Sequence, residues 1–349
     1  MPPDLPPAAL RLEIDRAALA ANWRALDRLS GTGRAGAAVK ADAYGIGARI
    51  AVPTLREAGC RDLFVTYTRE AADILDLAPP GEIALLHGPL TAEDAAWAKA
   101  TGVRPVINSL AQAQRWIEVG GGLCDVMIDT GINRLGVAMA ELGAESLRQL
   151  EIDVLHSHLA SAEEPVDLND RQRRRWQEAR VVLPHRRAAL ANSAGIALGP
   201  DFHGDLTRPG LALYGGVPCQ ELAGDLRQVA RPMAALMQVR TIGAGETVGY
   251  NATFTAQRAM RIGVIALGYA DGYLRSWSGG KGAFRWQGAR LPVLGRVSMD
   301  MTVIDLGDAP TLQEGDWVEA EYGLRDAAVA SGLSQYELLT LLADRFDRS

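Results

Sequence analysis

Short runs of apolar and β-branched residues alternate with longer amphipathic stretches over the first two thirds of the chain. After residue 34, the runs with the length of buried strands are residues 36–40, 61–66, 82–86, 104–107, 125–128, 152–155, 187–191 and 206–208. Helical spacing separates them, for example in residues 49–59, 91–102 and 109–121, several of which start on Ser or Thr and end on Gly. Eight strand and helix pairs of this kind predict a TIM barrel.

A different pattern starts at about residue 226, where β-like runs alternate with glycine-rich turns. These runs are residues 234–250, 261–273, 289–307 and 315–323, and a short helix is expected within residues 333–345. We therefore expect an α/β chain with a TIM barrel over residues 1–225 and a mainly β domain over residues 226–349. Pro53 lies inside one expected barrel helix, where it would kink the chain, so the limits of that helix stay open.

Composition narrows the class of protein. The chain has 349 residues, of which 48% are hydrophobic and 22% charged, as in soluble globular enzymes of two domains. A net charge of −6 gives no general attraction to nucleic acid or anionic lipid, so small metabolites are the expected partners. The basic run from Arg171 to Trp176 falls in an expected barrel helix with acids nearby, and we interpret it as a solvated helix face.

Targeting and metal-binding signals are absent from the sequence pattern. The N-terminus has no basic segment followed by an apolar one, and no stretch of eighteen apolar residues follows, so a cytoplasmic protein without a membrane partner is expected. The cysteines show neither CxxC spacing nor clustering with histidine: they are Cys60, Cys124 and Cys219. We therefore expect neither disulfides nor a metal site.

Side chains able to do chemistry lie at the carboxyl ends of the predicted strands, where TIM barrels build their active sites. They are Lys40 at the end of the first strand, Arg134 after the fifth, His158 after the sixth, Ser193 after the seventh and Arg208 at the end of the eighth. The apolar residues before Lys40 predict a desolvated amine with a lowered pKa, suited to Schiff-base chemistry. A phosphate site is expected after the last two strands, at Asn192, Ser193 and the turn Gly210–Leu211.

Motifs along nearly the whole chain resemble those of the alanine racemase family, and they occur in the family order. They are VKADAYGIG, IDTGINRLG, SHLASAEE, ANSAG, RPGLALYG, VGYNATFTA, GYADGY and GRVSMD. The set is highly specific, although each motif alone is weak. The resemblance implies a fold type III enzyme that binds pyridoxal 5'-phosphate (PLP) and interconverts L- and D-alanine. It also implies that Lys40 holds PLP and moves the proton of D-alanine, while Tyr250 moves that of L-alanine.

The resemblance assigns further residues to the cofactor. Arg208 matches an arginine beside the pyridine nitrogen of PLP, and it leaves that nitrogen unprotonated because arginine stays charged. His158 matches a member of the same network, which would also stabilise the anion of Tyr250. The residues that match the phosphate site are Tyr44, Ser193, Gly210 and Leu211.

The substrate is expected to meet residues of both domains. Arg134 and the backbone N–H of Met299 match groups that bind the substrate carboxylate, and Tyr269 matches a residue at the entrance. In the family, the tyrosine corresponding to Tyr250 comes from the second domain of the partner subunit. The resemblance therefore implies a homodimer with shared active sites.

Three positions depart from the family pattern. Ile46 stands where many members have histidine, at a position that is not catalytic. Met127 stands where some members carry a carbamylated lysine that orients the arginine, so we expect an anion such as chloride to balance Arg134. Asp344 falls near a tyrosine that contacts the phosphate in some members.

Two other functions fit parts of the pattern. A racemase of serine, or of a broader range of amino acids, would share the fold, because pocket width cannot be read from one sequence. A non-catalytic PLP-binding protein on the same barrel is the second alternative. Such proteins lack the β domain, so VGYNATFTA and GRVSMD argue against it.

Overall fold

The protein is described here by a computed structural model that covers residue 6, residues 8–342 and residues 344–349. The chain divides into two compact units. One is Arg16–Arg227, and the other combines the N-terminal segment up to Asp15 with Gln228–Ser349. The change of unit after Arg227 lies close to the expected boundary, whereas the N-terminal segment belongs to the second unit.

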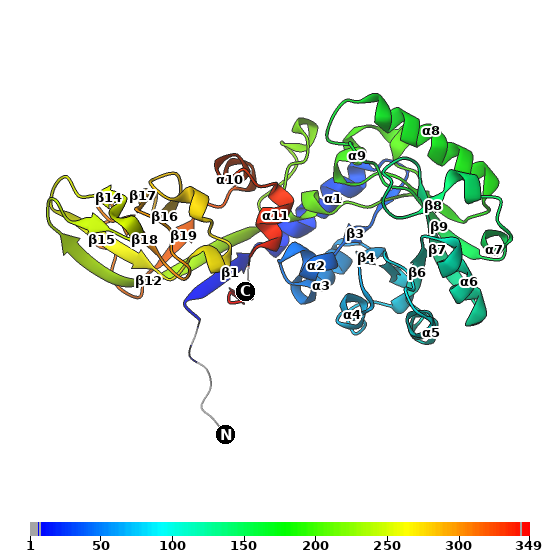
Figure 1. Cartoon of the computed structure of the whole chain (residues 1–349), viewed down its shortest axis with the longest axis horizontal. Helices are drawn as coiled ribbons and strands as arrows, with labels where there is room; N and C mark the ends of the chain where they lie inside the picture. The colour runs from blue at the N-terminus through cyan, green and yellow to red at the C-terminus, as the bar shows by residue number, and fades with distance from the viewer. Residues whose placement is uncertain (1–5, 7, 343) are drawn as a thin grey trace, which may run out of the picture. The chain divides into compact units, whose positions relative to one another are not determined.

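The unit Arg16–Arg227 is a parallel β-barrel with helices around it (Figure 1). Its strands pair in the order β3-β4-β5-β6-β7-β9-β10, and β11 pairs with β2, which leads directly into β3. Hydrogen bonds from Arg208 N to Ala191 O (2.8 Å) and from Ala38 N to Pro209 O (2.9 Å) join the last strand to both neighbours. The predicted TIM barrel is confirmed.

Each predicted strand has a counterpart in the described barrel. The strands are β2 (Arg34–Ala35), β3 (Ala37–Ala38), β4 (Leu63–Val65), β5 (Ile83–Leu85), β6 (Arg104–Ile107), β7 (Leu123–Asp129), β8 (Val137–Ala138), β9 (Glu151–His156), β10 (Arg187–Ala189) and β11 (Leu206–Thr207). Most residues of these strands are buried on both faces, as parallel strands are when helices cover the sheet.

The helices begin and end largely where capping residues predict. They are α1 (Arg16–Leu29), α2 (Lys40–Tyr44), α3 (Ala48–Ala58), α4 (Thr68–Ala72), α5 (Ala92–Thr101), α6 (Leu110–Glu118), α7 (Glu145–Arg148), α8 (Asp167–Val182) and α9 (Ser193–Ala197). Thr91 and Ser109 accept hydrogen bonds from the first turns of α5 and α6. Pro53 lies inside α3 without ending it, because the apolar face of that helix packs against α1.

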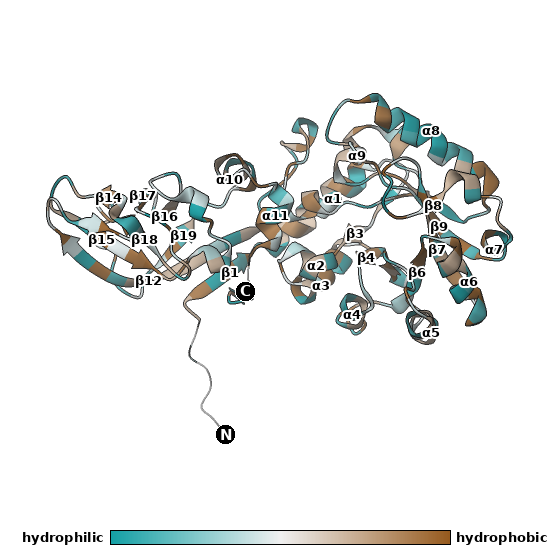
Figure 2. Cartoon of the chain, viewed as in Figure 1, coloured by the Kyte–Doolittle hydropathy of each residue, from teal (hydrophilic) through white to brown (hydrophobic). Residues whose placement is uncertain are grey.

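The longest barrel helix, α8, is mostly hydrophilic (Figure 2). Gln172, Trp176 and Ala179 are buried, whereas Arg171 and Arg174 are exposed. The basic run is therefore a solvated helix face, as predicted. Within the residues that the structure describes, no helix combines the length and the apolar composition needed to cross a bilayer.

The second unit is an antiparallel β-barrel. Its strands follow the order β15-β18-β17-β16-β19-β12, and β12 also pairs with β15, which closes the ring. The strand β12 reaches both neighbours because a bulge between Leu236 and Gln238 bends it. On its other part, β12 pairs with β1 from the N-terminal segment.

The elements of this unit are mainly strands, as predicted. They are β1 (Leu10–Ile14), β12 (Ala230–Ile242), β13 (Thr247–Val248), β14 (Phe254–Thr255), β15 (Met260–Ile265), β16 (Ala283–Trp286), β17 (Ala289–Leu294), β18 (Thr302–Asp305), β19 (Trp317–Ala320) and β20 (Asp347–Arg348), with helices α10 (Leu324–Ser331) and α11 (Gln335–Thr340). The helix expected within residues 333–345 is α11, and α10 precedes it.

Candidate active site

The segment after β3 carries Lys40 into a turn of unusual backbone conformation. Residues 41–44 all have φ between 51° and 57° although none is glycine. Left-handed backbone costs roughly 1–2 kcal/mol per residue for L-amino acids. The turn is held from outside, since Glu70 Oε1 accepts from Ala41 N (2.7 Å) and Asp42 Oδ1 accepts from Ala48 N (2.6 Å). Strain of this kind concentrates at functional sites.

Lys40 and His158 lie among other positive charges. Burial lowers the pKa of Lys40, and Arg134 lowers it further, against an opposing effect of Glu70. Burial also lowers the pKa of His158 to about 3, with added contributions from Arg208, Arg134 and Lys40. These four side chains, which follow β3, β7, β9 and β11, therefore come together at the carboxyl ends of the barrel strands, as the sequence predicts.

Tyr44, Ser193 and Gly210 form a second part of the site. Ser193 Oγ accepts hydrogen bonds from Gly210 N (2.9 Å) and Ala212 N (3.2 Å). A Cβ atom at Gly210 would clash with the Tyr44 hydroxyl oxygen, so glycine suits this approach. Burial raises the pKa of Tyr44 to about 12, which keeps its hydroxyl a neutral hydrogen-bond donor. The predicted phosphate residues, with buried Leu211 next in the chain, are thus adjacent.

Arg208 is buried and surrounded by neutral acceptors. It donates to His156 Nδ1 (3.2 Å), to Leu190 O (3.3 Å) and, by a short bond, to Ser157 O. Among the described residues, no carboxylate forms an ion pair with Arg208. Burial lowers its pKa to about 10, opposed by Asp125, so the guanidinium stays charged at neutral pH.

The remaining predicted residues form a separate group in the second unit. Tyr250 begins a short 3-10 turn, Tyr250–Ala252, and its side chain is 65% exposed. Tyr269 and Met299 are also exposed, and their loops are joined by hydrogen bonds from Tyr269 N to Ser298 O (3.0 Å) and from Ala270 N to Met299 O (3.0 Å). This unit therefore presents Tyr269 and Met299 side by side on its surface.

Two family models match the chain, the alanine racemase N-terminal domain over residues 14–218 and the alanine racemase C-terminal domain over residues 229–349. The chain belongs to the alanine racemase family. It is 41% identical to an alanine racemase from Acidiphilium cryptum, over 97% of each chain. It is 39% identical to one from Rhizobium meliloti, over 99% of this chain and 98% of the other. A crystal structure of alanine racemase from Bartonella henselae, with covalently bound pyridoxal phosphate, has a TM-score of 0.87 and 34% identity, covering 98% of this chain and 99% of that one.

The departures from the alanine racemase pattern lie in different surroundings. Ile46 is fully buried, so an apolar side chain suits its place. Met127 is buried on β7, where it pairs in register with His156 of β9. Asp344 is exposed.

Sequence reasoning missed His156 and Asp125, which lie behind Arg208. His156 Nε2 is 3.1 Å from Asp125 Oδ2, and both side chains are fully buried. Two signals were present in the sequence. His156 precedes His158 by two residues, which places both on one side of an extended strand. Asp125 is an acid within a strand predicted to be buried, and such a charge needs a partner.

The close approach of Gly210 to Tyr44 gives a test of the site geometry. Gly210→Ala should lower the free energy of unfolding of the barrel by about 1–3 kcal/mol, because the methyl group overpacks against the Tyr44 hydroxyl. Gly143→Ala is the matched control, since a Cβ there meets no atom within 4 Å, and it should change stability by less than about 0.5 kcal/mol. Urea unfolding followed by circular dichroism measures both. Equal stability of the two variants would show that Tyr44 does not hold this position.

Proposed function

We propose that the chain interconverts L- and D-alanine, with PLP bound covalently to Lys40 and with Tyr250 of a partner subunit as the second acid/base. The observation that carries the proposal is the amine of Lys40. It has a pKa that burial and Arg134 lower, and it stands at the start of a strained turn that ends at Tyr44. The chain is an isomerase of the alanine racemase family.

The donors of the barrel fit PLP. A phosphate group needs hydrogen-bond donors and close backbone. The hydroxyls of Tyr44 and Ser193 and the backbone of Leu211 would donate, and Gly210, whose N–H donates to Ser193 Oγ, would allow the close approach. The glycine is required where a Cβ would meet the Tyr44 hydroxyl. Arg208 would donate to the pyridine nitrogen, because a cationic guanidinium cannot accept a proton from it. The covalently bound PLP of the Bartonella henselae relative supports this assignment.

Two groups would move protons on opposite faces of the substrate. When bound, PLP withdraws electrons from the amino-acid Cα and makes its proton more acidic. The Nζ atom of Lys40 would take or return the proton of D-alanine, and the hydroxyl of Tyr250 that of L-alanine. A positioned acid/base contributes roughly 10²- to 10⁴-fold to such a step. Because the two groups differ, each enantiomer loses its proton to a different residue.

The substrate would be oriented by its carboxylate. Arg134 would bind it together with the backbone N–H of Met299, and Tyr269 would line the entrance. Met127 has no amine to form a carbamate, so a bound anion would balance Arg134. His158, whose pKa near 3 keeps it neutral, would complete the network between Arg208 and Tyr250 without adding charge.

Sharing of the site between two subunits is supported by the surface of the second unit. Tyr250, Tyr269, Met299 and Met301 expose 65%, 39%, 53% and 43% of their surface. The loops that carry Tyr269, Met299 and Met301 are joined by hydrogen bonds, and exposed apolar and aromatic side chains that lie together mark interaction sites. We therefore propose a homodimer in which the second unit of one chain completes the barrel site of the other.

The direction of the reaction follows from the chemistry of enantiomers. L- and D-alanine have equal free energies in water, so the enzyme would drive the ratio toward one. Where L-alanine predominates, the net product is D-alanine, and we propose that role here.

We also propose a cytoplasmic location. The free cysteines Cys60, Cys124 and Cys219 support a reducing compartment of this kind.

Removal of Lys40 tests the cofactor assignment. The chain contains three lysines, Lys40, Lys99 and Lys281, and Lys99 Nζ donates to Gly121 O (2.6 Å). Lys40→Ala should therefore abolish the borohydride-reducible adduct with PLP, measured by mass spectrometry of the reduced protein. Lys99→Ala is the control and should keep the adduct. An adduct that persists in Lys40→Ala would refute the assignment.

Mixed dimers test the sharing of sites. Lys40→Ala and Tyr250→Phe should each be inactive, and mixing them should restore part of the activity, because one site of a heterodimer recovers both groups. The racemase assay should be combined with native mass spectrometry that proves heterodimer formation. Proven heterodimers without activity would argue for sites built within one chain.

Isotope exchange tests the two roles. Tyr250→Phe should still exchange the Cα hydrogen of D-alanine with solvent deuterium, because Lys40 remains, but it should racemise neither enantiomer above a small residual rate. Proton NMR in deuterated buffer follows exchange in the wild type and the variant. Equal loss of exchange from both enantiomers would contradict the division of roles.

A further inference from the structure

A line of buried polar side chains runs from Arg208 into the interior of the barrel. Arg208 donates to His156 Nδ1 (3.2 Å), and His156 Nε2 lies 3.1 Å from Asp125 Oδ2. Arg208 is 6% exposed and the other two are fully buried. The three residues come from β7, β9 and the end of β11, so separate strands must align to form the line.

The tautomer of His156 follows from its neighbours. Arginine has only N–H donors, so the Nδ1 atom of His156 must accept. The Nε2 atom therefore carries the hydrogen and donates it to Asp125. The neutral imidazole is stable here, because burial lowers its pKa to about 4 despite the opposing hydrogen bond to Asp125.

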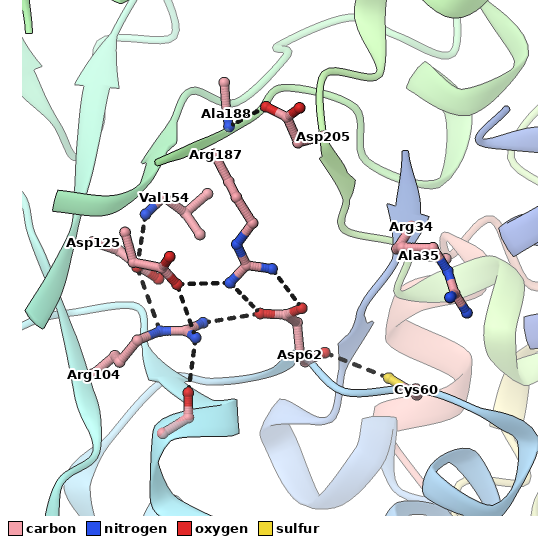
Figure 3. Close-up of polar contacts among 12 residues, drawn as sticks. Arg34, Ala35, Cys60, Asp62, Arg104, Asp125, Val154, Arg187, Ala188 and Asp205 are labelled. Carbon is pink, nitrogen blue, oxygen red and sulfur yellow. Dashed lines mark hydrogen bonds and ion pairs between the residues drawn. The ribbon is translucent and has the colours of Figure 1, made fainter. Parts of the chain in front are cut away.

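Behind Asp125 lies a cluster of ion pairs at the amino ends of the strands (Figure 3). The contacts are Arg104 to Asp62 (3.1 Å), Asp125 (3.4 Å) and Asp153 (3.1 Å), and Arg187 to Asp62 (2.8 Å) and Asp153 (2.6 Å). Burial alone would raise the pKa of Asp125, but Arg104 and His156 outweigh burial and hold it below its usual value. Three aspartates thus face two arginines in this cluster, and Asp125 is the one that also contacts His156.

We propose that His156 is a positioning residue for Arg208, and that Asp125 fixes the His156 tautomer which makes this possible. The inference rests on the proposed function, in which Arg208 meets the pyridine nitrogen of PLP. Three N–H bonds of the guanidinium are occupied by His156, Ser157 and Leu190, which leaves its remaining donors for the cofactor. A neutral acceptor orients Arg208 without neutralising it.

The variant Asp125→Asn tests the tautomer directly. In the wild type, Asp125 Oδ1 accepts from Val154 N (3.1 Å) and faces Arg104 Nε. These donors would hold the oxygen of the new amide, so its NH₂ group must face His156 Nε2. His156 would then carry its hydrogen on Nδ1 and point it at the guanidinium, donor against donor. The dissociation constant of PLP should rise roughly tenfold to a hundredfold, as expected when a hydrogen bond to a charged group is lost.

Nitrogen-15 NMR of the histidine-labelled holoenzyme measures the tautomer of His156. A residue with a purely structural role would not change this tautomer. The His156 signal, identified by its loss in His156→Gln, should change from the Nε2–H to the Nδ1–H pattern in Asp125→Asn. Asp153→Asn is the matched control, because it removes a carboxylate from the same cluster without touching His156. It should lower stability but keep the wild-type tautomer and PLP affinity.

The outcomes separate the inference from the proposed function. A wild-type Nδ1–H tautomer, or a PLP affinity of Asp125→Asn equal to that of Asp153→Asn, would overturn the inference alone. A wild-type protein that binds no PLP would overturn the proposed function.

If Asp125→Asn fails to fold, His156→Gln and His156→Met replace it. The glutamine amide can accept from Arg208 and donate to Asp125, so its PLP dissociation constant should stay within about threefold of the wild type. Methionine offers no such acceptor, and the constant should rise roughly tenfold. Equal PLP affinities of these two variants would contradict the role of His156.

Discussion

Positive charge gathered at one end of the barrel is the constraint on which the site depends. Lys40, Arg134 and Arg208 each lower the pKa of His158. Within the described residues, neither Arg134 nor Arg208 forms an ion pair with a carboxylate. Removing charges from water without partners is costly. The fold meets this cost by lowering the pKa of Lys40 and by keeping His158 neutral. The phosphate of the cofactor and the carboxylate of the substrate would neutralise these positive charges. The site would therefore favour anionic ligands through charge as well as through shape.

The other end of the barrel solves the opposite problem. Asp62, Asp125 and Asp153 are buried together, and Arg104 and Arg187 connect them. Buried ion pairs of this kind give little net stability, but breaking one leaves a buried charge and is strongly destabilising. The cluster therefore fixes how the strands align. That alignment also places His156 where it reaches Arg208, so the two ends of the barrel are linked through one imidazole.

The order of strands and the residues at their ends could be predicted because both depend on local patterns. Lys40, Arg134, His158 and Arg208 follow parallel strands, and parallel strands deliver their carboxyl ends to one face. The ion cluster could not be predicted in this way, because Asp62 and Arg187 are 125 positions apart and periodicity says nothing about such pairs. The strand β1 was not predicted, and its pairing with β12, more than 200 positions away, could not be read from local alternation for the same reason. The proposal that Tyr250 completes the site of a partner subunit came from resemblance to the family and not from a physical pattern in the sequence.

His156, at the end of β9, and His158, two residues later, have different roles because their neighbours differ. Both imidazoles are desolvated, and their pKa values fall to about 4 for His156 and about 3 for His158. His158 has several cations for neighbours, which add to the effect of burial. His156 has Asp125 on one side, which opposes that effect and fixes the position of its hydrogen. Because neither histidine gains a proton near neutral pH, the charge around Arg208 stays constant there. Changes of protonation in this range are then left to the groups that exchange protons with the substrate.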